Sequence, residues 1–121
     1  MVPVASAVYA FCCSTIPKKT KYGICAVPDE LLFFLFNSVH KNRSTAHAAI
    51  QVSPDQAPFL KKTCFLDTGL LLPFASDDIG SAIRQGKVWP VPSDLREAIK
   101  GRVSFHGILA GKYEKIVLQN F

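Results

Sequence analysis

The sequence lacks any apolar run of the ~18–20 residues that a membrane-spanning helix requires. Its apolar runs, such as residues 31–36, have only the length of a strand. Residues 1–13 are apolar but lack the early Lys or Arg that opens a secretory leader, and small residues precede most of the apolar stretch. We therefore expect no membrane partner and a buried first strand.

Metal and cofactor signatures are also missing. The four cysteines (Cys12, Cys13, Cys25 and Cys64) show neither C-x-x-C spacing nor histidines at zinc-ligand offsets. No glycine-rich phosphate loop, nucleophile elbow, H-E-x-x-H motif or paired carboxylate is present. The sequence therefore predicts no metal and no cofactor, and it predicts reduced cysteines that pack as small hydrophobic residues in a cytoplasmic protein.

The composition is that of one folded domain with an excess of positive charge. The chain has 121 residues, 49% of them hydrophobic, and a formal net charge of +5. Residues 1–63 carry seven Lys and Arg against three acids, whereas residues 64–121 carry seven against six. A basic half favours a polyanionic partner such as nucleic acid, although an excess of this size also suits a charge that only maintains solubility.

Apolar runs bounded by turn residues predict strands at 4–15, 22–27, 31–37, 46–52 and 64–67, with one helical turn at 55–60. Helical periodicity follows at 77–85, 93–100 and 104–118, with serines as N-caps and Gly86 and Gly101 as helix ends. Residues 87–91 are expected to be extended. We predict an α+β fold in a single domain, 1–121, with a barrel or curled antiparallel sheet at 1–75 and a helical appendage at 76–121.

Basic and hydroxyl residues cluster at the predicted strand ends, and these residue types suit RNA cleavage without a metal ion. The 2′-hydroxyl of RNA can attack the adjacent phosphate if a base takes its proton, a cation stabilises the phosphorane and an acid protonates the leaving oxygen. Each candidate also has a structural interpretation, as a turn residue at Ser53 or as solvated charge elsewhere. The candidates are Lys18, Lys19, Lys21, His40, Lys41, Arg43, Ser53, Lys61 and Lys62.

The order of these segments resembles the PemK/MazF-type toxin family. The resemblance covers most of the chain in pattern. The residues that carry it are 19–27 (KTKYGICAV), 32–38 (LFFLFNS), 50–53 (IQVS), 58–67 (PFLKKTCFLD) and 93–99 (SDLREAI). It implies a small SH3-like β-barrel of about five strands with C-terminal helices. It also implies a metal-independent endoribonuclease toxin that cuts single-stranded RNA.

The resemblance assigns roles to the candidates. A basic residue before the second strand, Lys19 or Lys21, would stabilise the phosphorane, and Ser53 would position the phosphate or the attacking hydroxyl. His40 is the candidate acid or base. The residues expected to bind RNA are Lys18, Lys41, Arg43, Lys61 and Lys62. The family usually has Arg where this chain has Lys, and Lys lacks the bidentate fork of Arg.

The expected partners are single-stranded RNA, an acidic antitoxin protein and a second copy of the chain in a homodimer. Two alternatives stay open. The same fold could bind nucleic acid or an acidic protein without cleaving anything, or its apolar surface could dock a partner protein.

Overall fold

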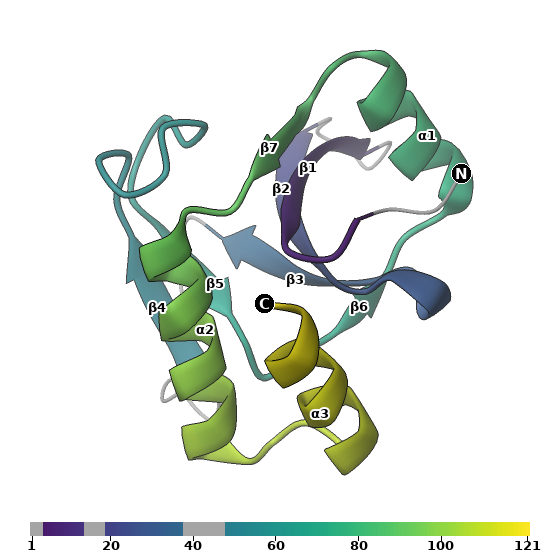
Figure 1. Cartoon of the computed structure of the whole chain (residues 1–121). Helices are drawn as coiled ribbons and strands as arrows, with labels where there is room; N and C mark the ends of the chain where they lie inside the picture. The colour runs from purple at the N-terminus through teal and green to yellow at the C-terminus, as the bar shows by residue number, and fades with distance from the viewer. Residues whose placement is uncertain (1–3, 14–18, 38–47) are drawn as a thin grey trace.

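The computed structural model of the chain describes residues 4–13, 19–37 and 48–121. It confirms an α+β fold with an antiparallel sheet followed by helices (Figure 1). The strands are β1 (Ala7–Cys13), β2 (Lys19–Val27), β3 (Leu32–Asn37), β4 (Ala49–Val52), β5 (Cys64–Asp67), β6 (Leu72–Pro73) and β7 (Val88–Pro90). The helices are α1 (Ser76–Arg84), α2 (Ser93–His106) and α3 (Gly111–Asn120), with a short 3-10 turn, η1 (Pro28–Glu30).

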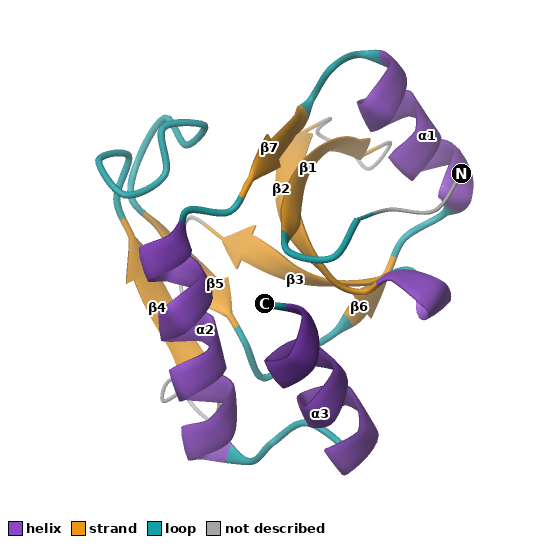
Figure 2. Cartoon of the chain, in the orientation of Figure 1, coloured by secondary structure: helices purple, strands orange, loops and turns teal. Residues whose placement is uncertain are grey.

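The sheet is strongly curled, with the strand order β4-β5-β3-β2-β1-β7 and β6 paired to β3 (Figure 2). Every pairing in it is antiparallel. Within the described residues the end strands β4 and β7 are not hydrogen-bonded to each other, so the sheet is not a closed barrel. The SH3-like barrel therefore stays a prediction, while the bent antiparallel sheet is observed.

Alternation along the central strands divides the buried residues into two cores. Ile24 lies opposite Phe34 in the β2–β3 register, and both are buried in the main core beneath α2 and α3. Their neighbours Cys25 and Phe33 also face each other, but they point to the opposite side, into a smaller core that α1 covers. Successive side chains of a strand point to opposite faces of the sheet. The same β2–β3 pairing therefore places residues in both cores.

The helices differ from the predicted ones at their ends. The prediction of one helix at 93–100 and another at 104–118 is wrong, because α2 runs through Gly101 to His106 and α3 begins at Gly111. Gly107 ends α2 in the left-handed conformation. Ser76 and Ser93 are the first residues of their helices, with Ala75 and Pro92 at the N-cap positions, and Ser104 lies within α2. The predicted end of α1 near Gly86 is confirmed, since Gly86 has a φ of +68°.

One short strand, β6, was not predicted, whereas β7 lies within the segment 87–91 that the sequence predicts to be extended. β6 and β7 contain only two and three residues, and each includes a proline. β7 returns from the helical half of the chain to pair with β1, so residues 76–121 are more than a helical appendage. The helical turn predicted at 55–60 is instead a pair of tight turns, in which Gln56 and Leu60 donate backbone hydrogen bonds to Ser53 and Ala57.

Candidate nucleic-acid interface

The β4–β5 loop, residues 53–63, carries three of the candidate residues and has a defined conformation. The carbonyl of Ser53 accepts hydrogen bonds from the backbone N–H groups of Gln56 and Ala57, both at 3.0 Å. The Gln56 side chain turns back, and its Oε1 accepts from the Ser53 N–H at 3.0 Å. The Ser53 hydroxyl lies 3.4 Å from the same oxygen. Ser53 therefore opens a tight turn directly after β4.

An aromatic cluster, comprising Tyr22, Phe36, Phe59 and Trp89, holds this loop against the sheet. Phe59 stacks on Trp89 of β7, with ring centroids 5.7 Å apart and an interplanar angle of 26°. Tyr22 of β2 contacts both rings, at 5.7 Å from Phe59 and 5.9 Å from Trp89. Phe36 of β3 meets Phe59 edge to face at 5.7 Å. The cluster thus brings the loop to β7, the end strand farthest from β4 in the sheet order.

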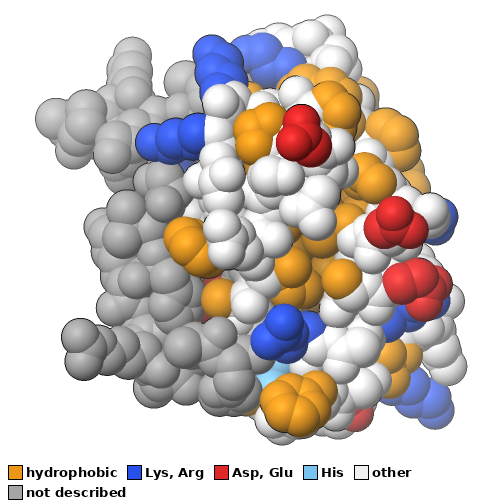
Figure 3. Space-filling model, turned by 90° about the vertical axis from the view of Figure 1, so that its left-hand side faces the viewer, with side chains coloured by type: hydrophobic (Ala, Val, Ile, Leu, Met, Phe, Trp, Pro, Cys, Tyr) orange, Lys and Arg blue, Asp and Glu red, His pale blue; other side chains and the backbone are white. Residues whose placement is uncertain are grey.

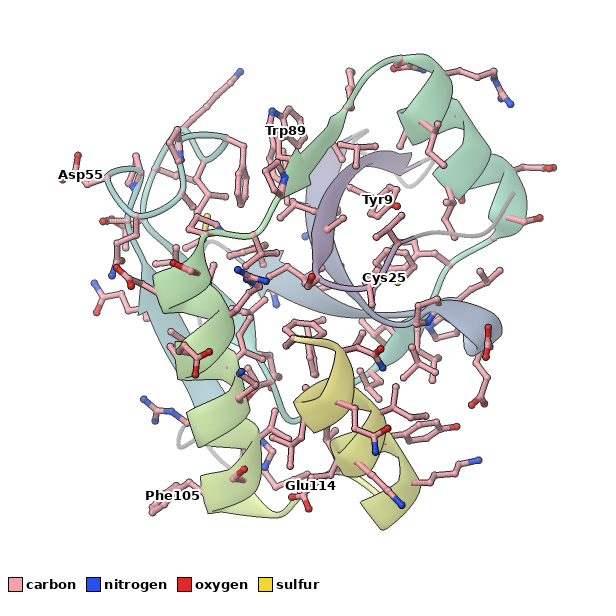
Figure 4. All side chains as sticks on the ribbon, in the orientation of Figure 1. Tyr9, Cys25, Asp55, Trp89, Phe105 and Glu114 are labelled. Carbon is pink, nitrogen blue, oxygen red and sulfur yellow. The ribbon has the colours of Figure 1, made fainter. Side chains whose placement is uncertain are left out.

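A groove opens beside the stacked pair. It has a volume of about 390 Å³ and is lined by Pro58, Phe59, Trp89, Pro90, Val91 and Pro92. We call it the Trp89 groove. Figure 4 shows Trp89 between β7 and the β4–β5 loop. The volume lies within the ~300–1,000 Å³ typical of small-molecule sites.

The β4–β5 loop and its neighbours carry both cations and acids. Lys61 and Lys62 are exposed on the β4–β5 loop, and Lys87 is exposed just before β7. A second hollow of about 370 Å³ shares Pro92 with the Trp89 groove and includes Asp55, Asp94 and the amides of Gln51 and Gln56. On the face that carries β4 and α2, Figure 3 shows several Lys and Arg side chains along the upper edge of the molecule.

The candidates divide into those that the structure places and those that it does not describe. Ser53, Lys61 and Lys62 lie on one loop. Lys21 lies on β2, opposite Phe11 and next to Tyr22, and is partly buried. Lys19 is the first residue of β2, and its side chain is outside the description. The remaining candidates, Lys18, His40, Lys41 and Arg43, lie outside the described residues. The role of each stays a prediction.

Strand alternation also bears on Lys21. Tyr22 and Ile24 point into the main core, so Lys21 points to the face of β2 that Cys25 shares. Lys21 therefore lies on the α1 side of β2, whereas the aromatic cluster lies on the other side.

The described cysteines fit a structural role. Cys25 and Cys64 are free and buried. Burial raises the pKa of the Cys25 thiol to about 12, and burial also raises the pKa of Cys64 despite the nearby Lys62 cation. Both thiols are therefore protonated at neutral pH and pack as hydrophobic groups, as the sequence predicts.

Residues 4–13, 19–37 and 48–121 contain no group of three His, Cys, Asp or Glu side chains arranged to hold a metal ion. None of the helices in this part of the chain is long and apolar enough to cross a bilayer.

No family model, curated protein or solved structure matches this chain. The site therefore has to be interpreted from its own geometry.

Proposed function

We propose that this chain is a metal-independent endoribonuclease that binds and cuts single-stranded RNA along the rim formed by the β4–β5 loop, β2 and β7. On this proposal it acts in the cytoplasm as the toxin of a toxin–antitoxin pair, as the resemblance to the PemK/MazF-type family implies. An acidic antitoxin protein would then cover the basic rim, and the curled sheet would be a divergent SH3-like barrel.

One observation carries the proposal. The Phe59–Trp89 stack fixes a loop that holds a hydroxyl, Ser53, and two exposed cations, Lys61 and Lys62, beside an apolar aromatic groove. Proteins that bind single-stranded nucleic acid combine these parts, since cations attract the backbone and aromatic rings stack on bases. The buried, protonated thiols of Cys25 and Cys64 suit the reducing cytoplasm.

The proposed chemistry requires no group beyond the chain and the RNA. The 2′-oxygen attacks the adjacent phosphorus, its proton passes to a base, and the 5′-oxygen leaves with a proton from an acid. The products are a 2′,3′-cyclic phosphate and a 5′-hydroxyl. Lys19 or Lys21 would stabilise the phosphorane, Ser53 would position the phosphate or the attacking hydroxyl, and His40 is the candidate acid or base.

Incubation of labelled RNA with the purified chain in EDTA tests the proposal. We expect cleavage and cyclic phosphate ends. Changing the phosphorane-binding lysine, tested as Lys19→Ala and Lys21→Ala, should slow cleavage about 100-fold with little loss of binding, because one transition-state donor is worth ~3 kcal/mol. Lys115→Ala, at an exposed position on α3, is the matched control.

Three results would count against parts of the proposal. Absence of cleavage with and without Mg²⁺ excludes the enzyme. Cleavage that needs Mg²⁺ excludes the metal-free mechanism. An equal loss of binding and cleavage in the lysine variants reduces that lysine to a positioning role.

A second candidate function is binding of RNA without cleavage. The contacts of Ser53 favour it, because its N–H, carbonyl and hydroxyl all take part in the local turn with Gln56 and Ala57. Ser53→Ala tests whether Ser53 has a catalytic or only a structural role. If Ser53 acts on the phosphate, the variant loses cleavage and keeps its melting temperature within a few degrees; if Ser53 only shapes the turn, stability falls and any cleavage survives.

A further inference from the structure

The Trp89 groove differs from an ordinary exposed apolar patch in its rigidity. Three of its six lining residues are prolines, whose rings fix the backbone. β7 is held by antiparallel pairing to β1, and the Val91 N–H donates to the Ser6 carbonyl at 3.2 Å, just beyond the strand. Phe59 is fixed by contacts with three other rings. The groove is therefore formed before any ligand arrives.

The same prolines restrict how a partner can bind. A peptide that adds to a sheet edge needs a row of backbone N–H donors. Pro90 ends β7 and Pro92 follows two residues later, and neither has an N–H. A ligand of this groove must therefore be held by contact with ring faces and edges.

We infer that the Trp89 groove is a stacking site for an unpaired nucleobase of the strand bound at the rim. This inference rests on the proposed RNA-binding function and names its base subsite. A flat, apolar base matches a groove with aromatic and pyrrolidine rings on its walls. A volume of about 390 Å³ accommodates a ligand of the size of a base with its sugar.

Charge determines where the phosphates of that nucleotide run. Lys61 and Lys62 follow Phe59 closely in the β4–β5 loop and are exposed. On the other side of Pro92, Asp55 and Asp94 line the second hollow, where their carboxylates disfavour a phosphate. The backbone of a base seated in the groove should therefore pass over the two lysines. Because the groove lining is mainly apolar, stacking there should tolerate any base.

Trp89 is the single tryptophan of the chain, so its fluorescence reports directly on this groove. The 121-residue chain is titrated with a thymidine oligodeoxynucleotide, which lacks the 2′-hydroxyl and cannot be cut by the proposed mechanism. An abasic oligomer with the same number of phosphates serves as the matched ligand. We expect the thymidine oligomer to quench Trp89 and to bind about 5- to 100-fold more tightly than the abasic one, the range expected for one stacked base.

Variants provide a second readout by anisotropy of a labelled oligomer. Trp89→Leu should lose about the same factor in affinity, and Trp89→Phe should retain most of it. Phe105→Leu is the control, because Phe105 is 77% exposed at the other end of α2 from the groove (Figure 4). If Trp89→Leu fails to fold, the wild-type titration and the affinity of Trp89→Phe still test whether a base stacks in the groove.

Equal affinity for the two oligomers, or unchanged Trp89 fluorescence at saturation, overturns the inference. Quenching by a proline-rich or apolar peptide but not by the thymidine oligomer also overturns it and makes the groove a peptide site. Cleavage is scored separately with RNA. If RNA is bound through Trp89 but not cut, only the catalytic proposal fails; if RNA is cut with equal affinity for both oligomers, only the base subsite fails.

Discussion

Cys25 shows how a single side chain responds to the interior of this fold. It lies on β2, faces Phe33 across the β2–β3 pair and is 0% exposed. Its neighbours in the smaller core include Tyr9 and Ile79, both buried. Such surroundings disfavour a thiolate, which is why burial raises the Cys25 pKa to about 12. The thiol therefore contributes packing rather than reactivity.

That pKa predicts a dependence of stability on alkaline pH. In the unfolded chain a thiol ionises near pH 8.5, whereas the folded state keeps the proton until about pH 12. The stability due to the neutral thiol is complete below pH 8.5 and decreases as the pH rises toward 12. Between about pH 9 and 11, the wild type should lose ~1.4 kcal/mol per pH unit more than Cys25→Ala does. Urea denaturation at several pH values measures this, and parallel curves for the two proteins would contradict it.

A hydrogen bond between buried Thr68 and partly buried His106 fixes one end of α2. Thr68 is 0% exposed and donates its hydroxyl to the Ala48 carbonyl at 2.6 Å. His106 Nδ1 accepts from the Ile108 N–H at 2.9 Å, so Nδ1 carries no proton. The proton of the neutral ring is then on Nε2, which donates to the Thr68 oxygen at 3.1 Å. This chain of hydrogen bonds connects the end of β5 to the end of α2.

Among the elements, α2 illustrates how packing overrides a local sequence signal. Gly101 is typical of a helix end, yet α2 continues past it because Ile99 and Val103 are both buried in the main core. The helix ends at Gly107, whose φ of +60° is readily adopted only by glycine and whose N–H bonds back to the Val103 carbonyl at 3.4 Å. The two glycines therefore have opposite roles.

A matched pair of substitutions tests these roles. A methyl group at Gly101 or at Gly107 meets no atom within 4 Å, so only the backbone conformation distinguishes the sites. Gly107→Ala should destabilise the protein by about 1 kcal/mol, since alanine is strained at positive φ. Gly101→Ala should stabilise it by up to ~1 kcal/mol, since alanine favours the helix. Thermal or urea denaturation gives both values. Two changes of the same sign would show that α2 does not end at Gly107.

Most of the secondary structure was predictable from the sequence, because long apolar runs and helical periodicity record burial. The predicted strands at 22–27, 31–37 and 64–67 correspond to β2, β3 and β5. β6 could not be predicted, since two residues carry no period and Pro73 argues against a strand. The extended segment at 87–91 was predicted, but its pairing with β1 as β7 could not be predicted from so few residues. Such strands form only because a neighbouring strand supplies the hydrogen bonds.

For the molecule as a whole, the site was less predictable than the fold. The basic and hydroxyl residues could be selected by type, but the aromatic cluster joins Tyr22, Phe59 and Trp89, which are far apart in the sequence. No periodicity links them, and only the curl of the sheet brings β7 to the β4–β5 loop. Trp89, with Lys87 before it and Pro90 and Pro92 after it, was a local sign of this site that the sequence prediction did not use.

Charge on the whole surface also has to be distinguished from charge at the rim. The chain carries a net charge of +5, so a polyanion could bind weakly anywhere on it. Lys61 and Lys62 lie on the β4–β5 loop, whereas Lys112 and Lys115 lie on α3, away from that loop in Figure 1. Both pairs are exposed, so replacing either pair lowers the net charge equally without disturbing the core.

Salt dependence of binding separates the two cases. Each cation in contact with a single-stranded phosphate adds about −0.7 to the slope of log K against log salt concentration. The double variant Lys61→Ala/Lys62→Ala should therefore flatten the slope by about 1.4 and weaken binding of a labelled oligodeoxynucleotide at low salt. Lys112→Ala/Lys115→Ala should leave the slope unchanged. If the two double variants flatten the slope equally, binding follows net charge alone, and the strand does not pass over Lys61 and Lys62.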